Sequence, residues 1–189
     1  MSLWKRLAAR YGSGAGEVDD VRMDSTTNAL IGVDYAHHEV HDGSHYFIKK
    51  WADITGAATV AYFMFVTPNT TKRIHAKVAI AAEAEFRVEI FEGGTVSANG
   101  TALTAINNDR DSASTAGLLA YNAPTVTSDG TQIWDTVVGS GKNSTISLGL
   151  NYEIIAATDE TYLFKITKVA AGTHWIDFDF FWYEHTSKH

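Results

Sequence analysis

The residues best suited to chemistry lie in one short segment, from His37 to His45. It reads His-His-Glu-Val-His-Asp-Gly-Ser-His, so four imidazoles and two carboxylates occur within nine residues. Imidazole nitrogens and carboxylate oxygens are zinc ligands, which makes a metal site the first chemistry to consider. The spacing is not the His-Glu-x-x-His of helical metalloproteases. It is not the cupin spacing either, because His37 and Glu39 stand where two histidines one residue apart are expected.

The elements that must position these side chains are, by the local pattern, a strand and a hairpin turn. Asp42-Gly43 is a strong two-residue hairpin signal. On a strand, His37, Glu39 and His41 share one face, whereas His45 falls on the other. The four imidazoles then do not converge on one ion. We therefore expect histidines that form structural hydrogen bonds or a pH-sensitive interface, and no bound metal or other cofactor.

Two further patterns resemble catalytic sites only superficially. Residues 139–142, Gly-Ser-Gly-Lys, lack the rest of a phosphate-binding loop, because Asn143 follows Lys142, and they are better explained as a hairpin loop. Asp177 and Asp179 share one strand face, where they could bind calcium or act on a sugar, but carboxylates on a solvated strand face are far commoner. We assign no catalytic residue and expect the protein not to be an enzyme.

The composition is that of a compact globular protein. Of 189 residues, 45% are hydrophobic and 20% are charged, which suits a single domain with its own core. The absence of cysteine excludes disulfides and thiolate chemistry. A net charge of −7 argues against nucleic acid as a partner, and no apolar run is long enough to predict a membrane span or a secretory signal.

The pattern divides the chain into an arm, residues 1–27, and a domain, residues 28–189. Residues 1–11 could form a short amphipathic helix, and a Gly-Ser-Gly-Ala-Gly connector follows at 12–16. The arm is therefore expected to be extended or partly helical. It is either a frayed terminus or a segment that docks onto a neighbouring subunit, with Trp4 and Leu7 as its apolar anchors.

From residue 28 onward the hydrophobic pattern has the period of two that is typical of strands. The clearest strands are predicted at 59–66, 73–81, 85–91, 131–138, 152–156, 162–169 and 174–184. The last of these has one strongly aromatic face and is expected to lie centrally in its sheet. Short strands without intervening helices predict an all-β fold, an antiparallel β-sandwich or jelly-roll-like domain.

Residues 93–130 contain few large apolar side chains and many Thr, Asn, Ser and Gly residues. We interpret this region as long excursions from the β scaffold and as the first place to look for a contact surface. The five tryptophans could include a platform for sugar rings, although most aromatic residues in a sandwich belong to its core.

Several ordered motifs resemble those of tailed-bacteriophage capsid decoration proteins, also described as cement or head stabilisation proteins. The motifs are NALIGVDY at 28–35, HHEVHDGSHYF at 37–47, TPNTTK at 67–72, FEG at 91–93, NNDR at 107–110 and WYEHT at 182–186. The resemblance covers residues 25–186 and leaves the arm outside.

The resemblance implies a β-sandwich subunit, expected as a homotrimer, on the outer surface of the virion's capsid. It would bind the assembled major capsid protein and clamp neighbouring capsomers. The residues that we expect at the interface come from the arm and from two motifs, namely Trp4, Leu7, His37, His38, Glu39, His41, His45, Asn108 and Arg110. Two alternatives stay open: a carbohydrate-binding module on the virion surface, and a metal-dependent β-barrel enzyme.

Overall fold

The computed structural model describes residues 35–139, 145–146 and 153–186. The chain divides into two units, residues 1–37 and residues 38–189. The fold described below belongs to the second unit. The predicted arm, residues 1–27, lies outside the described residues.

Two antiparallel sheets make up the framework of the second unit. The first, called the β14 sheet, has the order β11 (Thr145–Ile146), β3 (Lys72–Ala82), β14 (Thr173–Thr186), β1 (His45–Thr55) and β7 (Ile106–Asn107), and β12 (Ile154–Ile155) also pairs with β3. The second, called the β13 sheet, has the order β10 (Thr131–Val138), β4 (Phe86–Glu92), β13 (Thr161–Lys168), β2 (Val60–Val66), β8 (Leu119–Asn122) and β6 (Thr101–Leu103).

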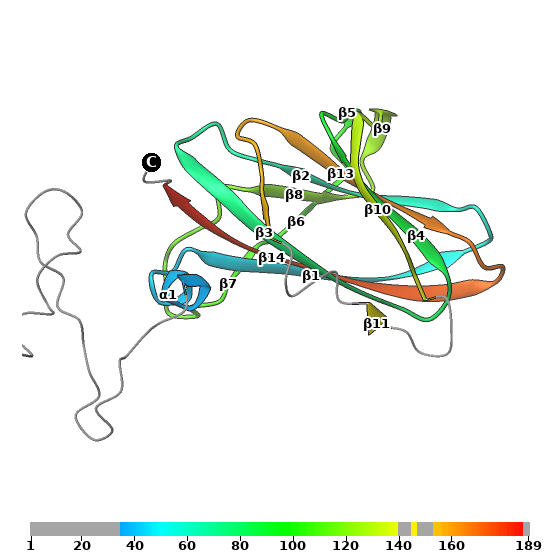
Figure 1. The fold of residues 1–189 in the computed structure, drawn as a ribbon, viewed down its shortest axis with the longest axis horizontal. Coiled ribbons are helices and arrows are strands. Elements are labelled where there is room, and N and C mark those ends of the chain that lie inside the picture. The colour runs from blue at the N-terminus through cyan, green and yellow to red at the C-terminus, as the bar shows by residue number, and fades with distance from the viewer. Residues whose placement is uncertain (1–34, 140–144, 147–152, 187–189) are drawn as a thin grey trace, which may run out of the picture. The chain divides into compact units, whose positions relative to one another are not determined.

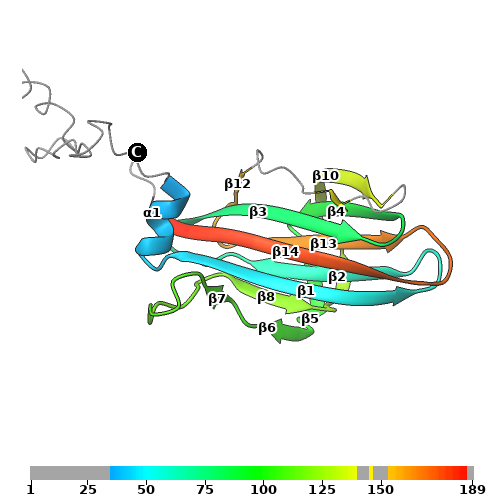
Figure 2. The ribbon, with the colours of Figure 1, turned by 90° about the horizontal axis from the view of Figure 1, so that it is seen from below.

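The chain passes repeatedly from one sheet to the other. The connections β1 to β2, β2 to β3, β3 to β4 and β13 to β14 all cross between the sheets (Figure 1). As a result β14 lies between β3 and β1 (Figure 2), and β13 lies between β4 and β2. This is the strand arrangement of a jelly roll, so the predicted all-β antiparallel sandwich is confirmed.

The core is an aromatic layer between the two sheets. Phe178 and Phe180 of β14 are buried, and their rings stack on Phe63 and Phe65 of β2 with centroid distances of 4.9 and 4.1 Å. Phe164 of β13 meets Phe178 edge-on at 5.2 Å. Offset and edge-on pairs of this kind contribute more than their buried area alone. The inward aromatic face of β14 therefore joins the two sheets, as its central position requires.

The region 93–130 is more ordered than the sequence predicted. Besides β6, β7 and β8 it forms a separate sheet of β5 (Thr95–Ala98) and β9 (Thr125–Ser128). Val96 and Val126 of this small sheet pack on a second apolar cluster around Met64, Phe91 and Leu163. The excursions are thus anchored by apolar side chains that are too sparse to produce a strand pattern in the sequence.

Most predicted strands are confirmed with small shifts at their ends, because alternation of buried and exposed side chains is a local property. Two differences stand out. The sequence analysis did not predict β1, a strand of eleven residues. The strand predicted at 152–156 is shorter in the structure, where β12 spans Ile154–Ile155, and residue 152 lies outside the described residues.

We predict that the two faces of β14 differ strongly in their contribution to stability. Phe178→Ala should lower the free energy of unfolding by about 3–5 kcal/mol, because it leaves a cavity between the sheets. Phe181→Ala, on the outward face of the same strand, should cost clearly less. Urea denaturation of the two variants measures both values. Equal losses would contradict the assignment of the inner face.

Candidate functional site

The histidine segment is helical, and the predicted strand and hairpin at this point are wrong. Helix α1 spans Tyr35–His41. Gly43 has a φ of 68°, its N–H donates to the carbonyl of Val40, and the N–H of Ser44 donates to the carbonyl of Glu39. This pair of hydrogen bonds is the Schellman ending of a helix. Asp-Gly suits a hairpin and a helix end alike, because both need a glycine with positive φ.

The helix changes which side chains of the segment meet. His38 and Asp42 lie one turn apart, with 3.5 Å between Nδ1 and Oδ2. Glu39 is buried and accepts a short hydrogen bond from the Ser44 hydroxyl, so it holds the turn and is not available as a surface contact. His37 and His41 are exposed. Among the described residues, His38, Glu39 and Asp42 bring their ligand atoms within 4.8 Å of one another, a grouping that suits a divalent cation.

The second predicted contact segment, around Asn108 and Arg110, lies directly against the end of α1. Asn107 donates from its side-chain amide to the carbonyl of Gly43 at 2.8 Å. Asn108 donates from its backbone to the carbonyl of His45 at 2.9 Å and from its side chain to the His45 Nδ1 at 2.7 Å. Arg110 is exposed and donates to the carbonyl of Asn107 at 3.3 Å. Two motifs that are more than sixty residues apart thus form one surface.

Gly43 is required at this junction for a second reason besides its φ. A Cβ added there would lie 2.3 Å from the Ser112 hydroxyl oxygen. The Ser112 side chain, in the loop after β7, therefore packs directly against the backbone of the turn after α1. A larger residue at position 43 would push this loop away from the turn.

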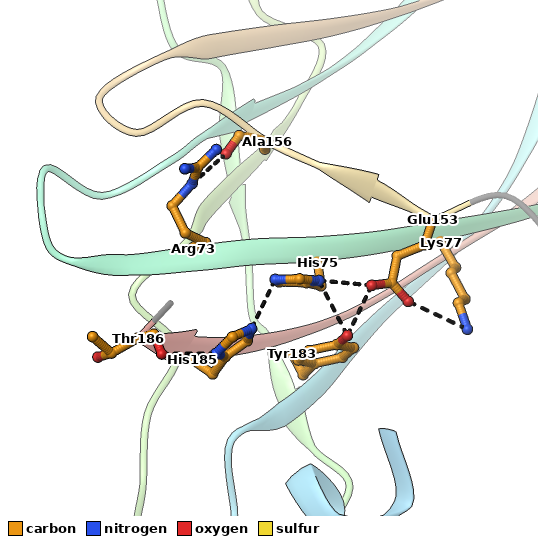
Figure 3. A network of polar contacts seen from close by, with 8 residues as sticks. All are labelled: Arg73, His75, Lys77, Glu153, Ala156, Tyr183, His185 and Thr186. Atoms are coloured by element: carbon orange, nitrogen blue, oxygen red, sulfur yellow. Dashed lines mark hydrogen bonds and ion pairs between the residues drawn. The ribbon is translucent and has the colours of Figure 1, made fainter. Parts of the chain in front are cut away.

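Next to this junction, the outward face of the β14 sheet carries a polar network that the sequence analysis did not predict. Figure 3 shows His75 of β3 between Tyr183 and His185 of β14, with Glu153 above them. His75 donates through Nδ1 to the Glu153 carboxylate at 2.6 Å, and the Tyr183 hydroxyl donates to the same oxygen at 2.8 Å. The Nε2 atoms of His75 and His185 are 2.9 Å apart. Lys77 lies 3.6 Å from the other Glu153 oxygen.

Each of the two imidazoles has a polar contact at both of its ring nitrogens. His185 Nδ1 faces the carbonyl of Thr186 at 3.0 Å, and His75 Nδ1 faces the Glu153 carboxylate, so a ring N–H is the donor in each of these contacts. The Nε2 atoms of the two rings face each other. These contacts hold both rings in fixed orientations.

The electrostatics of Glu153 agree with this arrangement. Burial alone would raise the pKa of Glu153, but the hydrogen bonds from His75 and Tyr183 outweigh it, so the pKa lies below its ordinary 4.5. The carboxylate therefore stays ionised over the neutral range, where it can hold His75 and Tyr183 in place.

His45 extends the row of rings toward α1. Its ring stacks on Tyr183 with 6.3 Å between centroids, and Tyr183 in turn stacks on His75 at 4.6 Å. Burial lowers the pKa of His45 below its ordinary 6.5, Lys77 lowers it further, and Glu39 acts in the opposite direction. A neutral His45 can accept the hydrogen bond from Asn108, whereas an imidazolium cannot accept through Nδ1.

Farther along the same face, Asp177 and Asp179 are joined by one lysine. Lys49 lies 2.6 Å from Asp177 and 3.0 Å from Asp179. The hydrogen bonds that Lys49 donates to the two aspartates raise the pKa of Lys49. Both carboxylates already have a cationic partner, which supports the structural interpretation of this acidic pair.

The sequence contained only a weak signal for the missed residues. His75 stands on the polar side of an alternating strand, and Tyr183 and His185 continue the outward face of β14. Their meeting depends on the register Tyr183↔His75 and Tyr183↔His45, which pairs residues far apart in the chain. The remaining predicted contacts, Trp4 and Leu7, lie outside the described residues, as does the loop at 140–142.

Comparison with protein-family models, with curated proteins and with solved structures found no match for this chain. Within the described residues, α1 is too short to cross a membrane, and no other helix could do so. The candidate site therefore rests on its own geometry: the end of α1, the segment from Asn107 to Arg110, and the ring row of His45, Tyr183, His75 and His185.

We predict that His45 makes the fold less stable as the solution becomes acidic. Because the folded pKa lies below 6.5, the unfolded chain binds a proton that the folded chain resists, and stability falls as the pH drops below that value. His45→Gln should remove this component. The free energy of unfolding of the variant should then fall less than that of the unaltered protein between about pH 7.5 and about pH 5.

Urea denaturation at both pH values measures this difference. His38→Gln is the matched control, because it removes an exposed imidazole from the neighbouring helix. An equal pH dependence in His45→Gln and the unaltered protein would contradict the assignment.

Proposed function

We propose that this protein is a structural virion component that binds the outer surface of an assembled phage capsid and clamps neighbouring capsomers. The observation that carries the proposal is the meeting of the motifs on which the sequence resemblance rests. The end of α1, the NNDR segment at 107–110 and the WYEHT segment at 182–186 come from distant parts of the chain and lie together on one face and end of the sandwich.

The chemistry of this surface suits recognition of another protein. Arginine side chains are enriched at protein interfaces, and here Arg110 is exposed in the loop that bonds His45. The buried Tyr183 and His75 rings pack against the partly exposed rings of His45 and His185. Hydrogen bonds fix Asn108 on His45 and Glu153 on His75 before any partner arrives. A surface that is already ordered loses little conformational entropy on binding, which favours affinity.

Clamping also requires several contacts at once. In the proposal the protein acts as a homotrimer, and the arm adds Trp4 and Leu7 as further anchors on the major capsid protein. Linked weak contacts reinforce one another through their effective concentration. Because the clamp binds only the assembled shell, it stabilises that shell by mass action.

We predict that the protein binds undecorated capsids saturably and raises their melting temperature. Removal of residues 1–24 should weaken binding, because it removes the anchors Trp4 and Leu7. Arg110→Gln should also weaken it, by about 1 kcal/mol or more, because it removes a charged contact from the proposed interface. Co-sedimentation of purified protein with capsids measures each affinity.

Arg87→Gln is the matched control for Arg110→Gln. It removes the same charge from an exposed position on β4, where Arg87 pairs with Glu89 and Asp135. Absence of binding by the full-length chain, or equal effects of the two substitutions, would argue against this proposal.

A second candidate function, binding of a surface glycan, has its own supporting observation. Trp51 is 54% exposed on the outward face of β1, opposite Asp177 and on the same face as Lys49. Phe47 and Phe181 lie farther along this face, with 6.4 Å between ring centroids. An exposed aromatic ring with carboxylate and ammonium groups beside it can stack on a sugar and hydrogen-bond its hydroxyls.

For this candidate we predict that Trp51→Ala abolishes any binding detected on a glycan array. Leu119→Ala is the control, because Leu119 is 52% exposed but lies on the other sheet. Glycan binding that survives in Trp51→Ala would exclude this face as the sugar site.

A further inference from the structure

An apolar cavity of about 310 Å³ lies between the two sheets, apart from the candidate site. Its walls come from β2, β3, β4, β13 and β14. Two further lining residues, Ile133 of β10 and Ile154 of β12, are 41% and 36% exposed. Large apolar side chains that both line a cavity and contact solvent mark its opening. The cavity therefore reaches the surface between β10 and β12.

The two hydroxyl groups in the lining, of Tyr162 and Thr67, already have hydrogen-bond partners in the protein. The Tyr162 hydroxyl donates to Glu92 at 2.8 Å and accepts from the backbone N–H of Ala157 at 2.9 Å. The Thr67 hydroxyl donates to the carbonyl of Ala157 at 2.8 Å. Burial raises the pKa of Tyr162 to about 12, so its hydroxyl stays neutral. No ionisable lysine, arginine, histidine or carboxylate is among the described residues that line the cavity.

The aromatic side chains in the wall present both ring faces and ring edges. Phe164 stands nearly perpendicular to Phe65 and to Phe180, with interplanar angles of 77° and 81°. Trp134 and Tyr162 complete this aromatic part of the lining. Aromatic molecules pair well with such a wall, because they can stack on one ring and meet another edge-on.

Size and chemistry together indicate the class of ligand. An apolar cavity of roughly 150 Å³ holds benzene, so about twice that volume suits a molecule of two fused rings. An empty apolar cavity destabilises a fold in proportion to its volume, and a ligand that fills it recovers the lost contacts. We propose that this cavity is a binding site for a small, uncharged aromatic molecule of about two rings. This site is independent of the proposed capsid function.

The test uses naphthalene and 2-naphthoate as a matched pair of probes. Naphthalene should bind saturably, as measured by titration calorimetry, and should raise the melting temperature with its concentration. 2-Naphthoate has the same rings plus a carboxylate, and it should bind at least about tenfold more weakly, because burial of its charge has no cationic partner in the wall. Absence of saturable naphthalene binding, or equal binding of the two probes, would overturn the proposal.

Two pairs of variants locate the site. Ala76→Leu places a larger side chain in the cavity and should weaken naphthalene binding at least about tenfold, whereas Ala79→Leu, on the outward face of the same strand, should not change it. If Ala76→Leu does not fold, Ile133→Trp at the opening serves instead. Its control is Val137→Trp, equally exposed at 41% on the same strand and outside the lining. Binding that none of these substitutions changes would place naphthalene elsewhere and overturn the assignment.

Discussion

The fold depends on the different side chains that β14 presents on its two faces. Inward, Phe178 and Phe180 are buried and join the two sheets through stacked and edge-on rings, and Trp182 is buried beside Tyr46 of the same sheet. Outward, Phe181 and Tyr183 lie on the face that carries the candidate site. Because side chains alternate along a strand, a shift of one residue in the register of β14 would expose the core and bury the site at once. Core and site therefore share one constraint.

The same alternation places a carboxylate at the end of the core. Glu184 follows Trp182 and is buried, and it accepts hydrogen bonds from the backbone N–H groups of Gly117 and Leu118 and from the indole N–H of Trp182. A buried carboxylate is tolerated only when such donors replace water. These hydrogen bonds hold Gly117 and Leu118, which come directly before β8, against the end of β14. The Asn108 segment lies earlier in the same loop region, between β7 and β8. The rigidity of the candidate site thus begins inside the sandwich.

On the outward face the charges are arranged in small groups of opposite sign. Glu153 accepts hydrogen bonds from His75 and Tyr183 and lies beside Lys77, and Lys49 lies between Asp177 and Asp179. Hydrogen bonds hold the rings of His45 and His75 in fixed orientations, which a loose surface of the same composition would not provide. A partner protein would meet a face whose shape and charge are set in advance. This property, more than the presence of any one residue, supports recognition as the role of the surface.

The sequence by itself determined the all-β class, most strands, the buried face of β3 and the central place of β14, because period-two alternation is local. It also marked the histidine segment and Asn108, but it assigned the wrong element to the first, since Asp-Gly suits a hairpin and a helix end alike. Only the tertiary structure decided that His45, Tyr183 and His75 stand in one row. That row depends on the pairing of strands far apart in the chain, for which a single sequence gives no register.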